Sequence, residues 1–319
     1  MSVANVLGVP HAYELTPAAS QPETLVFVHG WLLSRCYWQP TLRLLSPRYR
    51  CLTYDLRGFG DSTRQLEQRQ TSPFIAEHSL QGELSRYGLA AYAEDLLALL
   101  QQFDLRRVWL VGHSLGGSIA LWAAHLAPQQ VEGVICLNAG GGIYIRDAFI
   151  QFRSAGQQMI RLRAGWLQHV PLLSLAFANL MVAKPLSLAW GRQRLRDLLR
   201  ADAAAARASL LASTAEPEVH YLPYLVSELQ QPAYFVTGTQ DKVMEPRYVR
   251  HLASFHRGFR QGDSNIIELA QCGHFAMLEQ TQQVAKLIQS VLEAHRDAAL
   301  GQPIGPSDRA VSDTGPSLP

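Results

Sequence analysis

The sequence has few charges, few cysteines and no visible internal repeat. Charged residues make up 17% of its 319 residues and hydrophobic residues 48%, whereas about 25% of an average soluble domain is charged. Such a chain is expected to be globular, as one large domain with an insertion or as two modest domains. The 28 Lys and Arg nearly balance the 26 Asp and Glu, so the overall charge gives no basis for binding nucleic acid.

The four cysteines, Cys36, Cys51, Cys136 and Cys272, include no C-x-x-C pair. Neither a disulfide framework nor a zinc site is indicated, and reduced thiols in packed positions are expected. The first ten residues lack a basic segment followed by a sustained apolar run, so they do not read as a secretory signal. A cytoplasmic protein is therefore expected.

The uncharged stretch 164–183 is a candidate membrane span. Residues 164–183 run for 20 residues without a formal charge, which is the length that a spanning helix needs. Five residues interrupt its apolar pattern: Gln168, His169, Pro171, Ser174 and Asn179. We expect a helical pair that is buried or lies on the surface, rather than a span.

Short apolar runs bounded by turn residues predict the strands of a sheet. They lie at 24–28, 49–54, 108–111, 134–137, 233–237 and 265–269. Helical patterns stand between several of them, as at 89–103 and 118–126. Alternation of strand and helix predicts an α/β fold whose parallel sheet has helices on both faces.

The alternation stops between residues 140 and 230, where the pattern predicts an inserted helical subdomain. Between Arg146 and Arg207 the chain has ten Lys and Arg against three Asp, a local charge of +7 that leaves the remainder at about −5. The predicted core is thus 1–139 with 231–295. From 296 to 319, 10 of 24 residues are Gly, Pro or Ser, which predicts a disordered tail.

The run Gly112-His-Ser-Leu-Gly116 follows a predicted strand and precedes a predicted helix. This is the G-x-S-x-G pattern in the setting it requires, where a sharp turn presents the serine hydroxyl at the sheet edge. The glycines leave room for neighbouring backbone. Ser114 is the candidate nucleophile, and it needs a histidine base that a carboxylate orients.

His274 is the candidate base among the eleven histidines, because its loop follows the last predicted strand and can reach Ser114. His113 is expected to point elsewhere, and His125, His251 and His256 lie in helical patterns. Asp241, just after the strand at 233–237, is the candidate acid.

Three other side chains near strand ends are less suited to be the acid. Asn138 carries no charge, and Asp55 and Asp61 are interpreted as turn-stabilising residues. The order serine, aspartate, histidine along the chain is the one expected of this pattern. Two backbone N–H groups, of Leu115 and of Trp31, are the candidate oxyanion hole. Whether the Trp31 side chain lines the pocket is not decided by the sequence.

These motifs, with Arg57-Gly-Phe-Gly-Asp-Ser62 and Gly238-Thr-Gln-Asp241, resemble the α/β-hydrolase superfamily over about residues 12–292. The resemblance is to the branch with a helical cap after the sixth core strand. It implies an eight-stranded, mostly parallel sheet, no cofactor, and an acyl pocket enclosed by cap and core. The dehalogenase and epoxide hydrolase relatives have Asp as nucleophile, so Ser114 argues against both.

The expected function is hydrolysis of a carboxylic ester, a small and lipophilic molecule, through an acyl-enzyme. Cofactor-free haloperoxidase or perhydrolase relatives and carbon–carbon bond hydrolases use the same triad and stay open, although the former usually have Met where this chain has Leu115. A hydrolase-like ligand receptor is the alternative of another class. The basic cap suggests contact with an anionic membrane surface, against the alternative of solvated arginines on a lid.

Overall fold

The structure is a computed structural model that describes residues 2–70, 86–142, 146–170, 172–260, 262 and 265–299. The predicted polar connection 63–86 and the predicted tail therefore lie largely outside the described residues.

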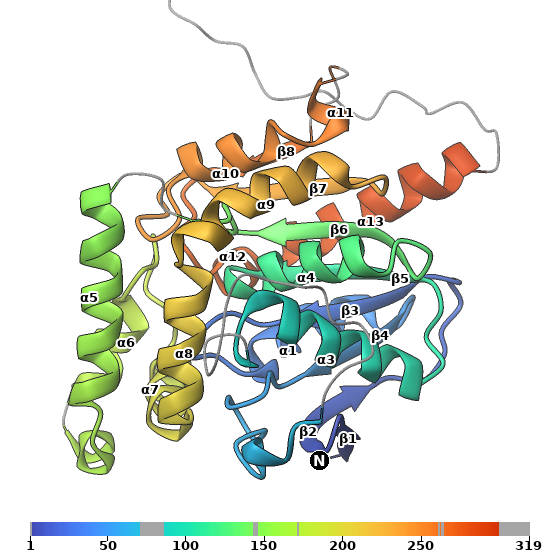
Figure 1. Cartoon of the computed structure of the whole chain (residues 1–319). Coiled ribbons are helices and arrows are strands. Elements are labelled where there is room, and N and C mark those ends of the chain that lie inside the picture. Colours follow the sequence, from blue (N-terminus) through green and yellow to red (C-terminus); the bar gives the residue numbers. More distant parts are fainter. Residues whose placement is uncertain are drawn as a thin grey trace, which may run out of the picture.

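A sheet of eight strands forms the centre of the molecule (Figure 1). Its strands are β1 (Ser2–Val6), β2 (Val9–Leu15), β3 (Thr24–Val28), β4 (Arg50–Tyr54), β5 (Val108–His113), β6 (Val131–Leu137), β7 (Ala233–Gly238) and β8 (Ile266–Leu269). They lie in the order β1-β2-β4-β3-β5-β6-β7-β8. Only the β1–β2 and β2–β4 pairs are antiparallel, so the predicted mostly parallel sheet is confirmed.

Six of these strands were predicted to within a few residues, and the edge hairpin of β1 and β2 was not predicted individually. β3 is buried along its whole length, whereas β1 alternates exposed and buried residues. The hairpin turns at Gly8, whose φ of +87° favours glycine.

Helices cover both faces of the sheet, as predicted. Residues of α3 (Leu89–Gln102), α4 (Leu115–Leu126), α9 (Glu216–Glu228) and α10 (Pro246–Ala253) belong to one hydrophobic cluster. Residues of α1 (Gln39–Leu45), α12 (Ala276–Glu279) and α13 (Thr281–Ala299) belong to a second cluster with other strand residues. The remaining short elements outside residues 140–230 are η1 (Arg35–Trp38), η2 (Leu66–Gln68) and α11 (Arg257–Arg260).

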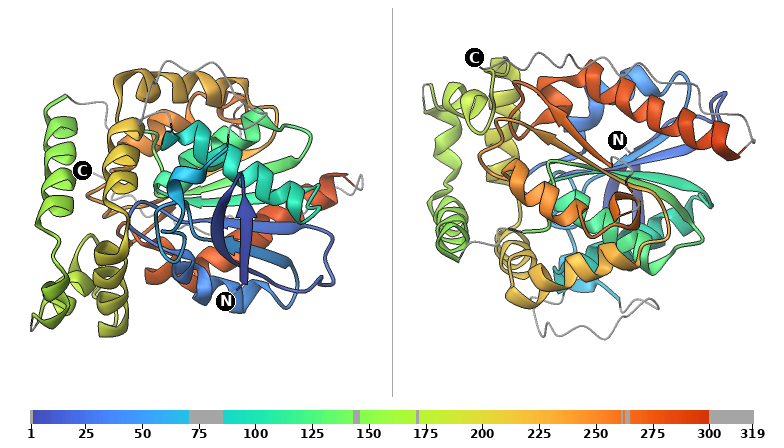
Figure 2. Two further views of the ribbon diagram at one scale, coloured as in Figure 1. Left: turned by 60° about the horizontal axis from the view of Figure 1, so that its bottom comes forward. Right: turned by 90° about the horizontal axis from the view of Figure 1, so that it is seen from above.

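The described residues between β6 and β7 form helices and no strand. They are α5 (Arg146–Leu162), η3 (Gly165–His169), α6 (Leu173–Asn179), α7 (Leu188–Arg200), α8 (Ala203–Ser213) and α9. We call residues 140–230 the inserted segment. Helices α5 to α8 lie beside the sheet at one end of the molecule (Figures 1 and 2). The exact division into core and cap stays a prediction.

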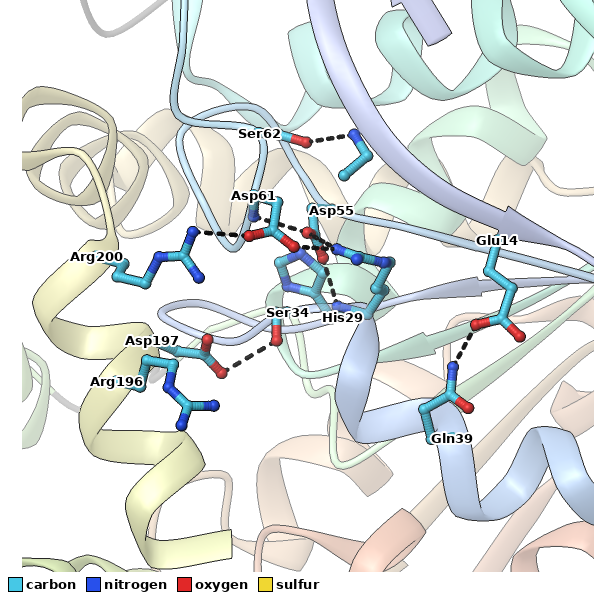
Figure 3. A network of polar contacts seen from close by, with 12 residues as sticks. Glu14, His29, Ser34, Gln39, Asp55, Asp61, Ser62, Arg196, Asp197 and Arg200 are labelled. Atoms are coloured by element: carbon cyan, nitrogen blue, oxygen red, sulfur yellow. Dashed lines mark hydrogen bonds and ion pairs between the residues drawn. The ribbon is translucent and has the colours of Figure 1, made fainter. Parts of the chain in front are cut away.

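Polar contacts attach α7 to two core loops (Figure 3). Arg200 forms an ion pair with Asp61 at 2.8 Å, and the Ser34 hydroxyl donates to the buried Asp197 carboxylate at 3.1 Å. Asp55 accepts from the backbone N–H of Arg35 and of Asp61. This agrees with the interpretation of Asp55 as a turn-stabilising residue, and it gives Asp61 a second task at the contact with α7.

Three further predictions concern the cysteines, the stretch 164–183 and the C-terminal residues. The cysteines are free thiols, three of them buried. The stretch 164–183 contains two short helices, η3 and α6, and no helix in the described part of the chain is long and apolar enough to cross a membrane. The predicted start of disorder at residue 296 is wrong, because α13 continues to Ala299 and Arg296 binds both Glu23 oxygens, at 2.8 and 2.9 Å.

A buried carboxyl group between α4 and α9 predicts a pH-dependent stability. Trp122 Nε1 donates to Glu218 at 2.6 Å. Burial raises the pKa of Glu218 to about 7, although the Trp122 hydrogen bond lowers it. The folded state therefore keeps this proton at pH values where the unfolded chain has lost it. The free energy of unfolding should fall as the pH rises from about 4.5 to 7.

The Glu218→Gln variant should lose this fall, because a carboxamide stays neutral and its oxygen can still accept from Trp122. The difference between variant and wild type should grow by at most about 3 kcal/mol over that range. Urea unfolding at pH 5 and pH 8 measures it. Glu216→Gln, on the exposed first turn of the same helix, is the matched control. Equal pH dependence in wild type and Glu218→Gln would contradict the prediction.

Candidate active site

The turn between β5 and α4 holds Ser114 in a backbone conformation that few residues adopt. Its φ is 52° and its ψ −120°, and φ values above zero are uncommon outside glycine. The Ser114 N–H donates to the carbonyl of Leu137 at 2.9 Å, which fixes the turn to the end of β6. Strain of this kind is maintained where the surrounding structure demands it.

The glycines of the G-x-S-x-G run are required by close backbone approach, as the sequence predicts. A Cβ on Gly112 would lie 2.3 Å from the carbonyl oxygen of Gly116, and a Cβ on Gly116 would lie 2.3 Å from that of Val28. Neither obstacle is a flexible side chain, so neither can move aside cheaply. The run therefore brings β3, β5 and α4 together at Ser114.

Asp241 and His274 meet at the carboxyl edge of the sheet. His274 Nδ1 and Asp241 Oδ2 are 2.8 Å apart, and both side chains are buried. The other Asp241 oxygen accepts from the backbone N–H of Val243 and Met244, at 2.8 and 3.0 Å. Burial alone would raise the pKa of Asp241, but His274 and these two N–H groups hold it below its usual value. The carboxylate is thus charged and fixed against the imidazole.

Asn138, set aside as an acid in the sequence, is a partner of the acid in the structure. Its Nδ2 donates to Asp241 Oδ2 at 2.9 Å and to the carbonyl of Gly273 at 3.0 Å. One side chain at the end of β6 thus holds both the acid and the loop of the histidine. Its position directly after a strand that ends beside β7 was the available signal.

His113 is buried next to His274, with ring centroids 4.9 Å apart. Its Nε2 lies 2.7 Å from the carbonyl oxygen of His274, so this nitrogen carries the proton. Burial lowers the pKa of His113 to about 3, which keeps the ring neutral. This contact agrees with the prediction that His113 does not point toward Ser114. The prediction did not include the support that His113 gives to the His274 backbone.

A third support, Glu279, binds backbone N–H groups on both sides of His274. It accepts from Gly273 and from Phe275, each at 3.0 Å, and from Ala183 of the inserted segment at 2.7 Å. The N–H of His274 itself donates to the carbonyl of Met181 at 2.9 Å. The histidine loop is therefore held by the core and by the inserted segment together.

The loop after β3 lies against Ser114. A Cβ on Gly30 would be 3.3 Å from Ser114 Cβ and 2.9 Å from His113 Nδ1, so only glycine fits without displacement. His29 Nε2 accepts the N–H of Leu56 at 2.9 Å, which leaves the proton on Nδ1 to donate to the Gly30 carbonyl at 2.8 Å. In a trans peptide the next N–H points opposite to that carbonyl. His29, which belongs to the His29-Gly-Trp31 motif but has no role assigned from the sequence, thereby aims the N–H of Trp31 away from itself.

The two candidate oxyanion donors border one cavity with Ser114. Trp31, Ser114 and Leu115 all line it, and within the described part of the chain neither the Trp31 nor the Leu115 backbone N–H donates a hydrogen bond. Leu115 is the first residue of α4, where the helix itself offers no acceptor.

The inserted segment supplies the opposite wall of this cavity. It is lined by Phe152 of α5, by Leu210 and Ser213 of α8, and by Thr214 directly after α8. The Trp31 indole donates to the carbonyl of Ala206 in α8 at 2.9 Å. The side chain left undecided in the sequence therefore both lines the cavity and attaches the inserted segment to the core.

The structure does not join all predicted residues by contacts. Asp241 and His274 are hydrogen-bonded, but among the described residues Ser114 Oγ has no hydrogen-bond partner. Catalytic hydrogen bonds are often long before substrate binds. No group of three His, Cys, Asp or Glu side chains in the described ranges is arranged to hold a metal ion.

Comparison with known proteins places this geometry in a family. The family model described as the alpha/beta hydrolase fold matches residues 23–281. The chain is 25% identical over 278 residues to the dihydrolipoyllysine-residue acetyltransferase component of an acetoin cleaving system from Pseudomonas putida. That match covers 85% of this chain and 64% of the Pseudomonas protein, so the chain spans less than two thirds of that relative.

Two further similarities are to esterases. A pimeloyl-[acyl-carrier protein] methyl ester esterase from Aliivibrio salmonicida is 34% identical over 111 residues, 35% of this chain and 34% of that protein. The solved structure of a thermophilic esterase from Thermogutta terrifontis has a TM-score of 0.67 at 21% identity, covering 92% of this chain and 98% of that one; this likeness concerns the fold. Because the family match extends over most of the sequence, the chain belongs to the α/β-hydrolase family.

Proposed function

We propose that this enzyme hydrolyses carboxylic esters through Ser114, His274 and Asp241. The observation that carries the proposal is the common cavity of Ser114 and two backbone N–H groups without a described partner. Met244 also lines this cavity, and its N–H donates to Asp241 of the buried Asp–His pair. A nucleophile needs a base and an anion-binding site at the same carbonyl. No described cluster competes with this arrangement for the role.

The proposed reaction has two halves. Ser114 Oγ attacks the ester carbonyl while its proton passes to His274 Nε2, which is free because Nδ1 faces Asp241. The tetrahedral oxyanion accepts from the N–H groups of Trp31 and Leu115. It collapses as His274 protonates the leaving alcohol oxygen, which leaves an acyl-Ser114 ester. Water attacks this ester while His274 takes a proton from the water. His274 then gives this proton to Ser114 Oγ, and the carboxylic acid is released.

The substrate is proposed to be lipophilic. Carbon-rich side chains such as Trp31, Leu115, Phe152 and Leu210 predominate among the walls around Ser114, and none of the described residues that line the cavity is charged. A charged acyl group would lose its hydration there without gaining a partner. The acyl portion is therefore proposed to be an uncharged chain.

Rapid mixing of excess p-nitrophenyl esters of increasing acyl length with the enzyme tests this proposal. We expect a burst of about one p-nitrophenol per enzyme, and mass spectrometry of the quenched protein should find the acyl group on Ser114. A burst that persists in Ser114→Ala would refute the assignment. Turnover only when hydrogen peroxide is added would favour a perhydrolase, and a single acylation without turnover would favour a ligand receptor.

A further inference from the structure

The inserted segment exposes large apolar side chains at one end of the molecule. Leu162, Trp166 and Leu172 are 74%, 65% and 77% exposed, and Leu175 and Leu188 are also open to solvent. We call these five residues the docking face. Burying this much apolar surface would be favourable, and such exposure on a described surface calls for an explanation.

The residues of the docking face come from elements that pack together. Leu172, Leu175 and Leu188 line one shallow depression with His169 and Arg192. Leu162 ends α5 and Trp166 lies in η3, the next element along the chain. Helices α6 and α7 lie beyond the edge of the sheet, on the side away from α13 (Figures 1 and 2). The five residues are exposed, whereas other residues of α7 contact the core loops.

The surroundings of the docking face carry charge of one sign. From Ala148 to Arg196 the chain has seven Arg and Lys and no Asp or Glu. Arg161, Lys184, Arg192 and Arg196 are exposed. A second copy of this chain would bring the same positive charges against one another, which is unfavourable. A surface with negative charge and an apolar interior suits this combination instead.

We propose that the docking face binds the surface of a bilayer that contains anionic lipids. The leucines and Trp166 enter the boundary between headgroups and acyl chains, and the exposed cations contact lipid phosphates. The polar face of an interfacial helix is typically rich in Arg and Lys, with Trp and Leu opposite. The proposal concerns contact with one leaflet and requires no spanning helix.

Packed residues connect the docking face to the histidine loop. Arg194 of α7 donates to the carbonyl of Leu180 at 2.7 Å and lies 4.3 Å from the centre of the Phe275 ring. Met181 accepts from the N–H of His274. If the proposed esterase function is correct, the enzyme meets its lipophilic ester at the bilayer surface. This last step alone rests on the proposed function.

Co-sedimentation of the full chain with vesicles tests the docking face. We expect binding to vesicles of phosphatidylcholine with phosphatidylglycerol, and much weaker binding to phosphatidylcholine alone. The triple variant Trp166→Ser, Leu172→Ser, Leu175→Ser and the triple variant Arg161→Gln, Lys184→Gln, Arg192→Gln should each lower the partition coefficient by about tenfold or more. Binding of the wild type should weaken with salt.

Matched controls separate this face from general hydrophobicity and charge. The variants Val3→Ser, Leu44→Ser, Phe259→Ser and Arg106→Gln, Arg107→Gln, Arg247→Gln alter exposed residues elsewhere and should bind as wild type does. Equal binding to both vesicle types, no effect of the docking-face variants, or a dimer that these variants dissociate would each overturn the proposal. Ser114→Ala should still bind vesicles, and p-nitrophenyl acetate turnover should survive the docking-face changes, so the two proposals fail independently.

Discussion

Replacement of Ser114 by alanine is expected to lower kcat for p-nitrophenyl esters by about 10⁵-fold or more, to the residual rate that binding and the oxyanion donors sustain. The reason is the loss of the acyl-enzyme route, since a methyl group offers no nucleophile. KM should change little, because the walls of the cavity stay in place. Steady-state kinetics measures kcat and KM, with the enzyme concentration determined by a method that does not depend on the active site.

Ser227→Ala is the matched control, because Ser227 in α9 is half-buried and its hydroxyl donates within its own helix, to the carbonyl of Tyr224. It should retain wild-type kinetics. Thermal unfolding of Ser114→Ala should remain close to that of the wild type, since Ser114 Oγ has no described hydrogen bond to lose. A Ser114→Ala enzyme with more than a tenth of the wild-type kcat would remove Ser114 from the mechanism.

The Asp241→Asn variant is expected to lower kcat by about 10⁴-fold. An amide nitrogen that faces His274 Nδ1 would move the imidazole proton to Nε2, the nitrogen that must accept from Ser114. Four donors surround this carboxylate, two from backbone, one from Asn138 and one from His274. Asparagine cannot accept from all of them, so we also expect a lower melting temperature.

A substitution of Asp61, the other carboxylate considered as the acid, tells an effect on stability apart from an effect on catalysis. Asp61→Asn weakens the ion pairs with Arg35 and Arg200, so it should loosen the contact with α7 while keeping kcat within tenfold of wild type. The pH dependence of kcat should stay unchanged in that variant. If Asp61→Asn lost as much kcat as Asp241→Asn, the assignment of the acid would be wrong.

The sequence predicted the central strands and also β8 at one edge of the sheet, but it missed the β1–β2 hairpin at the other edge. β3 and β5 are continuous apolar runs whose composition alone indicates a central strand. β1 and β2 carry polar residues and are stabilised by pairing with each other and by contacts such as Tyr13 with Phe103, 4.6 Å between ring centroids. Contacts of that range are invisible to a local pattern.

The start of α4 is a second place where tertiary contacts, which a local pattern does not show, decide the structure. The helical pattern in the sequence begins at Ser118, although Leu115 is expected at the N-terminus of the helix, and the two glycines between them are poor helix formers. The helix begins at Leu115 and includes Gly116 and Gly117. Packing against the carbonyl of Val28 and the side chain of Ala139 demands those glycines, and this tertiary requirement outweighs their low propensity.

The candidate site divides in a similar way. Ser114, Asp241 and His274 could be proposed from sequence because each follows a strand at the same edge of the sheet. Asn138 and His113 could not, because the groups that they bind lie 103 or more residues away along the chain. Glu279 could not, because its role includes a bond to Ala183 of the inserted segment. His113, for example, supports a carbonyl 161 residues away. Such roles depend on the register of the finished sheet, which no single segment encodes.

The backbone contacts of the inserted segment with the histidine loop set a limit on protein engineering. The carbonyl of Met181 and the N–H of Ala183 are both bonded at the His274 loop, and Gly273 has backbone of Val182 directly above it. A graft that exchanges residues 140–230 for the equivalent part of a relative would replace these contacts together with the cavity wall. To change substrate range without disturbing the histidine, the recipient should keep its own residues 181–183 and accept only the helices on either side.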